Sequence, residues 1–178
     1  MRLQPRNNRA TLDLLGVPRV ERNDRVKVMF VCLGNACRSP MAEAIARRDD
    51  DDVIEASSAG LSPLGRVEKM TKKTLVENGY SAEGLESKPI LLTEFDEADL
   101  VVNMSGQAKE LAFDDSSKVE DWQVEDPYGE DAEVYQRIFK DIEKRVAKLA
   151  ERLRSARGNR GATTAGRNVG HGKGTRKR

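Results

Sequence analysis

A cysteine and an arginine stand six positions apart in this sequence, at Cys32 and Arg38, and a hydroxyl residue, Ser39, follows the arginine directly. A thiolate is a strong nucleophile, and the planar guanidinium of an arginine can hold two oxygens of a tetrahedral anion at once. Around one oxyanion, these side chains are the parts needed for attack on a phosphorus atom. Cys32 would be the nucleophile, and Arg38 would stabilise the charged oxygens.

Few other kinds of chemistry remain open to Cys32. The single histidine, His171, lies in a glycine-rich terminal segment, so a cysteine protease would lack its base and a zinc site would lack ligands. The second cysteine, Cys37, lies in the same segment, and two cysteines this close do not form a disulfide framework. They suit a reducing cytoplasm. A nucleophilic Cys32 must therefore be stabilised as a thiolate by the backbone around it.

Attack on a phosphate ester also needs a group that protonates the leaving oxygen, and Asp126 is the candidate. It precedes Pro127 in a loop between the last predicted strand and the last predicted helix, and the proline stiffens that loop. An Asp-Pro pair also marks ordinary turns at the start of helices. In combination with Cys32 and Arg38, the pair indicates a general acid.

Local sequence predicts how the cysteine segment is held. The apolar run from Val28 to Val31 is typical of a short buried strand, and it ends at Cys32. A glycine-containing turn follows, and then a helix predicted to begin near Pro40 with Ser39 as its N-cap. The N–H groups of such a loop and the positive end of the helix form an anion trap. Both features favour a thiolate at the start of the loop.

Strands and helices alternate along the rest of the chain. Strands are predicted over residues 53–60, 100–102 and 119–124, and helices over residues 67–78, 105–113 and 134–153. Gly79 is expected in a left-handed conformation at the end of the second helix. The last helix has the clearest apolar period, which core packing explains. This alternation indicates a parallel α/β sheet, with ligands bound beyond the carboxyl ends of the strands, where Cys32 falls.

Composition divides the 178 residues into one domain with two extensions. Residues 1–25 carry a net charge of +3, residues 26–154 one of −9 and residues 155–178 one of +7, and both extensions are predicted to be flexible. The acidic body suits one soluble domain and no specific nucleic-acid partner. No apolar run is long enough to span a membrane, and the N-terminus lacks a signal-peptide hydrophobic region. A cytoplasmic protein is expected.

The segment around Cys32 and Arg38 resembles the low-molecular-weight protein tyrosine phosphatase family, and the resemblance extends over about residues 26–153. The further residues that carry it are Gly34, Asn35, Cys37, Ser39, Pro40, Asp126 and Pro127. The resemblance implies a four-stranded parallel sheet flanked by helices. It also implies hydrolysis of phosphorylated proteins in two steps through a cysteinyl-phosphate, with no metal and no cofactor. Asp126 would protonate the leaving group and then deprotonate the attacking water.

The resemblance implies roles for the neighbours of the nucleophile as well. The phosphate oxygens would be held by Arg38 and by the loop amides of Leu33, Gly34, Asn35, Ala36, Cys37 and Arg38. Asn35 would keep the loop in shape, and Ser39 would hydrogen-bond the thiolate. Leu33 and Tyr128 match positions that flank the phosphorylated side chain. The segment 58–60 matches a run of small residues that flanks the loop.

Two interpretations are open for Cys37. If peroxide oxidises Cys32 to a sulfenic acid, Cys37 can capture that group as a disulfide and prevent irreversible oxidation. A cysteine at this position can equally be a small packed residue. The first interpretation makes Cys37 a redox partner of the nucleophile.

Three departures from the resembling family leave the substrate open. Gly129 follows Tyr128 where a second aromatic residue is common, and residues 85–89 lack an often-present histidine. Ala36 stands where tyrosine phosphatases commonly have isoleucine and protein-arginine phosphatases have threonine. Phosphotyrosine is the expected substrate class, and phosphoarginine is the alternative. The oligomeric state stays open.

Two further classes of function compete with a protein phosphatase. Arsenate reductases share this fold and loop, but they pass oxidising equivalents through downstream cysteines, and this chain has none after Cys37. An external thiol would have to take their place. A phosphate-binding module without catalysis is the other class, and it would need neither a thiolate nor an acid.

Overall fold

The computed structural model describes residues 25–165 and contains one four-stranded parallel sheet, which confirms the predicted fold class. Its strands are β1 (Val26–Cys32), β2 (Ile54–Gly60), β3 (Leu100–Asn103) and β4 (Val119–Asp121), in the spatial order β2-β1-β3-β4. The helices are α1 (Arg38–Asp49), α2 (Lys69–Glu77), α3 (Leu92–Glu97), α4 (Lys109–Ala112) and α5 (Ala132–Ala165).

β1 lies in the middle of the sheet because its residues are apolar on both faces. Val28 to Val31 each expose 1% of their surface or less. The register sets Cys32 opposite Gly60 of β2 and Val31 opposite Asn103 of β3. The carboxyl ends of these strands therefore meet at one edge of the sheet, and Cys32 stands at that edge.

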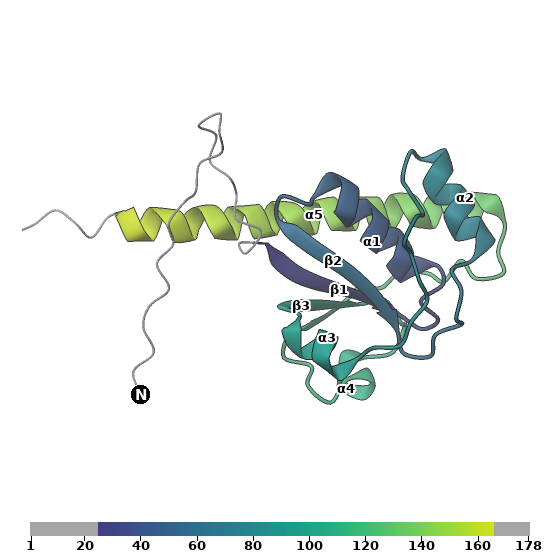
Figure 1. Ribbon diagram of the computed structural model, residues 1–178, viewed down its shortest axis with the longest axis horizontal. Coiled ribbons are helices and arrows are strands. Elements are labelled where there is room, and N and C mark those ends of the chain that lie inside the picture. The colour runs from purple at the N-terminus through teal and green to yellow at the C-terminus, as the bar shows by residue number, and fades with distance from the viewer. Residues whose placement is uncertain (1–24, 166–178) are drawn as a thin grey trace, which may run out of the picture.

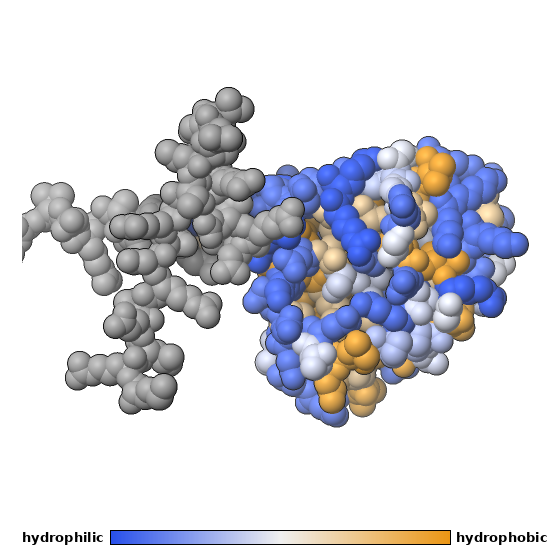
Figure 2. All heavy atoms as spheres, viewed as in Figure 1, coloured by the Kyte–Doolittle hydropathy of each residue, from blue (hydrophilic) through white to orange (hydrophobic). Residues whose placement is uncertain are grey.

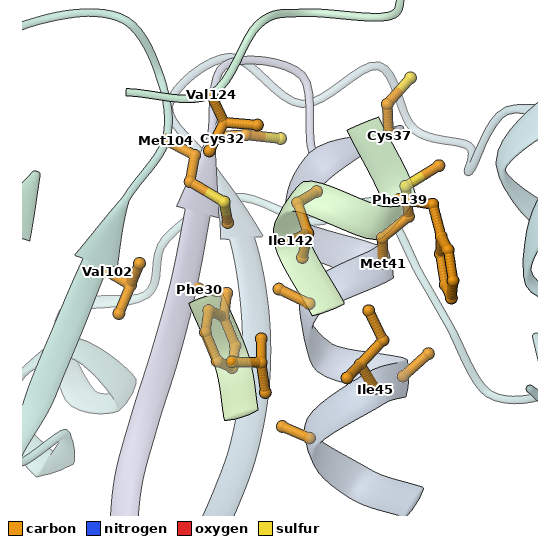
Figure 3. Close-up of a cluster of buried hydrophobic side chains, with 14 of the residues drawn as sticks. Phe30, Cys32, Cys37, Met41, Ile45, Val102, Met104, Val124, Phe139 and Ile142 are labelled. Carbon is orange, nitrogen blue, oxygen red and sulfur yellow. The ribbon is translucent and has the colours of Figure 1, made fainter. Parts of the chain in front are cut away.

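Helices and loops cover both faces of the sheet (Figure 1). On one face, Phe30 belongs to the larger cluster of buried apolar side chains, in which Met41 and Ile45 of α1 lie beside Phe139 and Ile142 of α5 (Figure 3). The alternate residues of β1 face a smaller cluster, built with the segments around α3 and α4. The helix that follows the cysteine loop is thus fixed between the sheet and α5.

The start of α1 differs from the sequence prediction. The helix begins at Arg38 with Cys37 as its N-cap, so Ser39 lies within the first turn instead of capping it. Its hydroxyl lies 3.0 Å from the sulfur of Cys32. The capping prediction was wrong because this hydroxyl interacts with the nucleophile candidate rather than with the backbone of its own helix.

The third predicted helix is also much shorter than expected. α4 has Ala108 as its N-cap, because the Ser105 hydroxyl accepts the backbone N–H of Gln107 in a turn after β3. The acidic stretch before β3 contains a helix, α3, that the sequence analysis did not predict. Gly79 has φ of +80°, which confirms its left-handed conformation at the end of α2.

α5 carries the predicted apolar stripe and continues beyond the predicted end of the domain at residue 154. The helix runs to Ala165 and extends past the sheet (Figure 1). Arg154 pairs with Asp50 and Asp52, and an Arg157 Nη donates to the Asp52 carbonyl oxygen at 3.2 Å. Residues 155–165 are therefore helical, contrary to the predicted flexible tail. The rest of that prediction falls on residues 1–24 and 166–178, which lie outside the described residues.

Polar and charged side chains cover most of the face seen in Figure 2. Apolar side chains gather in separate patches there, over α2 and over the end of the molecule that holds α3 and α4. The large apolar residues with the highest exposure in these elements are Val76, Leu92 and Leu111. Between residues 25 and 165, no helix is long and apolar enough to cross a bilayer.

Candidate active site

The segment between β1 and α1 forms a tight loop over the end of β2. Asn35 has φ of +45°, the one non-glycine residue with positive φ among those described, and this conformation turns the chain sharply. A Cβ atom on Gly60 would lie 2.9 Å from both the Cβ of Asn35 and the carbonyl oxygen of Leu33. A glycine is therefore required at this position because the loop backbone presses against β2.

Several carbonyl oxygens of the loop accept hydrogen bonds from residues that follow it in the chain. The carbonyl oxygens of Leu33 and Gly34 accept the backbone N–H groups of residues 62 and 64. Thr71 donates its hydroxyl proton to the Ala36 carbonyl at 2.9 Å, and Ser87 donates to that of Gly34 at 3.0 Å. Outside helices and strands, no hydrogen bond among the described residues has an N–H group of residues 33–37 as its donor, so these N–H groups stay available for an anion.

Residues from three separate segments line one cavity of about 310 Å³ above this loop. The lining residues are Cys32, Leu33, Gly34, Ala36, Cys37, Arg38, Ser62, Leu64, Asp126 and Tyr128. The predicted nucleophile, anion-binding arginine, acid and pocket residues thus lie together. The predicted supporting residues Asn35 and Ser39 do not line the cavity, and both are fully buried. Ser62 and Leu64 were not predicted, since nothing in their spacing sets them apart from other loop residues.

Cys32 is buried at the floor of the cavity. Its sulfur lies 3.0 Å from the Ser39 hydroxyl, which in turn lies 2.9 Å from the amide nitrogen of Asn35. A serine hydroxyl that accepts a hydrogen bond from an amide N–H still has its own O–H group available to donate a hydrogen bond to a thiolate. The start of α1 lies directly after the loop, and its positive end adds to this stabilisation of negative charge.

Arg38 and Asp126 form an ion pair at the mouth of the cavity. Arg38 Nη2 lies 2.5 Å from Asp126 Oδ2, and Nη1 donates to the carbonyl oxygen of Val124 at 3.3 Å. Arg38 Nε is buried and has no partner among the described residues. The Asp126 side chain is 44% exposed, and its other oxygen accepts the backbone N–H of Tyr128. An anion that binds Nη2 of Arg38 would have to replace this carboxylate, whereas Nε is free to donate to it.

Cys37 faces a different neighbour from Cys32. Its sulfur lies 3.4 Å from the hydroxyl of Tyr135 on α5, and both cysteines are free thiols. Burial raises the pKa of the Cys37 thiol above its ordinary value, with the Tyr135 hydrogen bond acting in the opposite direction. Burial likewise raises the pKa of Tyr135. Figure 3 shows the two cysteines at the upper edge of the larger apolar cluster. Sequence reasoning missed Tyr135, which lies within the core-facing side of an ordinary amphipathic helix.

The walls of the cavity combine apolar and charged groups. Leu33, Leu64 and Tyr128 are 41%, 45% and 51% exposed, so three apolar side chains border the entrance. Arg38 and Asp126 supply the charged groups at the same site. Within the described part of the chain, no group of three or more histidine, cysteine, aspartate or glutamate side chains could hold a metal ion. The arrangement suits an anionic group attached to a flat or apolar side chain.

Residues 27–159 match the family described as low molecular weight phosphotyrosine protein phosphatase. Among similar proteins, a glutaredoxin arsenate reductase from Synechocystis sp. is 34% identical over 129 residues, which cover 71% of this chain and 98% of the relative. A protein-arginine-phosphatase from Bacillus subtilis is 30% identical over 148 residues, 73% of this chain and 98% of the relative. Among solved structures, the low molecular weight protein tyrosine phosphatase from T. tengcongensis superposes with a TM-score of 0.65 at 30% identity. That match covers 72% of this chain and 99% of the solved one.

Proposed function

The chain belongs to the low molecular weight phosphotyrosine protein phosphatase family, and we propose that it hydrolyses phosphotyrosine in proteins through a cysteinyl-phosphate. The observation that carries the proposal is the convergence of three groups on one cavity. A buried cysteine, a buried arginine and a half-exposed aspartate come from positions 32, 38 and 126 and line the same 310 Å³. A pure anion-binding site would need the arginine and the loop amides alone.

In the first step, the thiolate of Cys32 attacks phosphorus. A sulfur–phosphorus bond forms while the bond from phosphorus to the tyrosine oxygen breaks, and Asp126 gives its proton to that leaving oxygen. Arg38 and the loop N–H groups hold the remaining oxygens as their charge is redistributed. The unpartnered Nε of Arg38 supports this role, because a buried donor without an acceptor is costly unless a ligand satisfies it.

In the second step, a water molecule attacks the phosphorus of the cysteinyl-phosphate. Asp126, now ionised, takes a proton from this water, and the sulfur–phosphorus bond breaks with its electron pair returning to Cys32. Inorganic phosphate leaves, and the thiolate is regenerated. The Ser39 hydroxyl, 3.0 Å from the sulfur, would stabilise the departing thiolate.

The entrance of the cavity favours phosphotyrosine over a small anion. Leu33, Leu64 and Tyr128 offer apolar and aromatic surface on which a phenyl ring can pack. Phosphoarginine is the second candidate, supported by the 30% identity to a protein-arginine-phosphatase over nearly that protein's whole length. Arsenate reduction is the third, supported by the 34% identity to an arsenate reductase. The lack of any cysteine after Cys37 weighs against it, because an external thiol must then complete the cycle.

One set of assays distinguishes these functions. We expect the protein to hydrolyse p-nitrophenyl phosphate in the presence of a metal chelator, and Cys32→Ser to remove turnover almost entirely. Glu125→Gln is the control variant. It changes a charged residue next to Asp126 that pairs with Arg137 outside the cavity, so it should keep its turnover. Hydrolysis of phosphotyrosine peptides faster than phosphoarginine peptides supports the proposed substrate.

The opposite results would each favour a different function. Faster release of phosphate from phosphoarginine peptides would assign the second candidate. Arsenate-dependent consumption of thiol without phosphatase activity would assign a reductase. Binding of inorganic phosphate without turnover on any of these substrates would leave a binding module.

A further inference from the structure

The segment that carries Asp126 is not held by a ladder of backbone hydrogen bonds. β4 ends at Asp121, and the N–H of Trp122 still donates to the carbonyl oxygen of Asn103 in β3 at 2.8 Å. Beyond this point, residues 123–126 take part in no backbone–backbone hydrogen bond with any residue that the structure describes. The position of the acid over the cavity is therefore set by side chains.

Some of these side chains belong to the segment itself and are apolar. Trp122 and Val124 expose 7% and 8% of their surface and belong to the larger apolar cluster. Gln123 and Glu125 alternate with them and are exposed. This alternation is typical of an extended chain that packs by one face. Apolar packing is not directional, so it keeps the segment on the core and leaves its finer placement to polar contacts.

Three arginines of α5 contact this segment one after another. They stand eight and seven residues apart, close to two turns in each case, and so lie along one side of the helix: Arg137, Arg145 and Arg152. Their partners follow in the opposite order along the chain, at residues 125, 123 and 120. α5 and the segment before Asp126 therefore run antiparallel to each other.

Arg145 differs from the other two arginines in the kind of partner it binds. Arg137 and Arg152 pair with glutamate side chains, and both arginines are more than half exposed. Water and salt screen such pairs, which contribute little. Arg145 Nη2 donates instead to the backbone carbonyl oxygen of Gln123 at 2.9 Å. A bond to the backbone acts on the path of the chain itself, three residues before Asp126.

The guanidinium of Arg145 is itself held in place. Its Nε donates to Asp141 Oδ2, one turn earlier on α5, at 3.0 Å, and two bonds from one planar group fix its orientation. The next carbonyl oxygen of the segment, that of Val124, accepts Arg38 Nη1 at 3.3 Å. Arg145 does not line the cavity, so a bound ligand can replace contacts of Arg38 but not this one.

We propose that Arg145 is a positioning residue for the general acid, because its bond to the Gln123 carbonyl holds the segment that places Asp126 over Cys32. The inference rests on the proposed function, since it takes Asp126 to be the proton donor. Within the described part of the chain, the other hydrogen bond to the backbone of residues 123–126 comes from Arg38, which also binds the phosphate. Without Arg145, the acid would be least well placed when substrate is bound.

The test compares two substrates that differ in their need for the acid. The phenol that leaves a phosphotyrosine peptide is a weak acid, so its oxygen must gain a proton, whereas 2,4-dinitrophenolate is stable as an anion. kcat/KM reports the reaction up to release of this group. Arg145→Met keeps an unbranched side chain without the donors. It should lower kcat/KM by about tenfold for the peptide and by no more than about twofold for 2,4-dinitrophenyl phosphate.

Arg152→Met is the matched control. It makes the same change on the same side of α5, at an arginine that pairs with Glu120 of β4, six residues before the acid. Both substrates should keep rates within about twofold of the wild type. The double variant Arg145→Met with Asp126→Ala should be no slower on the peptide than Asp126→Ala alone, because Arg145 acts through that carboxyl group.

Several results would overturn the proposal. They are an unchanged kcat/KM for the peptide in Arg145→Met, equal losses on both substrates, an equal loss in Arg152→Met, or additive losses in the double variant. The same assays keep the proposed function separate. An Asp126→Ala protein with unchanged kcat/KM for the peptide counts against Asp126 as the acid. A large loss there, with none in Arg145→Met, counts against the role of Arg145 alone.

Discussion

The two sides of the loop between Cys32 and Arg38 are built in opposite ways. On the cavity side, Asp126 and Tyr128 are about half exposed, and Arg38 is held by an ion pair that a ligand can replace. On the inner side, Asn35 and Ser39 are fully buried, and their polar atoms form hydrogen bonds in a connected row. Buried groups with fixed hydrogen bonds thus lie on one side of this loop, and groups that can exchange their partners for a ligand lie on the other.

This division has a physical reason. A thiolate needs donors that are already in place, because reorganising them during the reaction would cost free energy. The groups that meet substrate must exchange partners in every cycle, so they lie where water and ligand can reach them. Variants on the cavity side should therefore change turnover with little change in stability. Variants on the inner side should change the stability of the fold, the ionisation of the Cys32 sulfur, or both.

The largest expected effect is on the cavity side, at Asp126. Asp126→Ala should lower kcat by about 10²- to 10⁴-fold with p-nitrophenyl phosphate, since it removes the proton donor. It should also tighten the binding of inorganic phosphate by roughly threefold to tenfold, because Arg38 loses its competing carboxylate. Steady-state kinetics and inhibition constants for phosphate measure the two halves of this prediction, and the melting temperature should change little. An unchanged kcat would remove Asp126 from the reaction, and weaker phosphate binding would contradict the competition for Arg38.

Next in size is an effect on the inner side, at Gly60. Gly60→Ala places a Cβ atom 2.9 Å from the Leu33 carbonyl oxygen and from the Asn35 side chain. The loop or β2 must shift, which should lower the free energy of unfolding by about 1 to 3 kcal/mol and lower kcat with it. Urea unfolding measures the first change. Gly84→Ala is a control at a glycine with open space around it, where only the strain of its positive φ is tested. A loss at Gly60 no larger than at Gly84 would show that the loop does not press against β2.

The two cysteines extend the comparison to redox chemistry. The cavity-lining Cys37 carries a thiol whose pKa is raised by burial, so its thiolate forms less readily than an exposed one. We still expect it to capture a Cys32 sulfenic acid, forming a disulfide and releasing water. After peroxide treatment, dithiothreitol should restore most activity in the wild type and only a small fraction in Cys37→Ala. Equal recovery in the two proteins would leave Cys37 as a packed residue.

Much of the cavity side could be predicted from the sequence, because its chemistry depends on residue types in short segments. The strand, the glycine turn and the Cys32 to Arg38 spacing are local features, and Asp126-Pro127 is a recognisable pair. Their convergence on one cavity followed from the rule that ligands bind at the carboxyl ends of parallel strands. The helix start was missed by two residues, because Ser39 hydrogen-bonds a sulfur rather than capping α1.

The inner side could not be predicted in the same way. Ser58 and Glu43 are 15 residues apart and lie on a strand and a helix, and their contact depends on how α1 packs on β2. Ser87 and Thr71 likewise reach the loop from segments with no motif of their own. The continuation of α5 to Ala165 was missed for a similar reason, because Arg154 and its neighbours find acidic partners around residue 52 only in the folded protein.

The smallest expected effect is on the free energy of unfolding, and it comes from the buried carboxyl group of Glu43 on the inner side of the loop. Burial raises the pKa of Glu43 above its ordinary value of 4.5, so folding favours its neutral form. The stability that comes from a protonated Glu43 is present below about pH 4.5 and is lost as pH rises through the raised pKa. Glu43→Gln should therefore be more stable than the wild type at pH 7, by roughly 1 kcal/mol or less, and the gain should shrink toward pH 4. Urea unfolding at the two pH values measures it. A Glu43→Gln protein that is less stable at pH 7 would mean that the carboxylate supports the fold, and the contrast between the two sides of the loop would then be one of exposure alone.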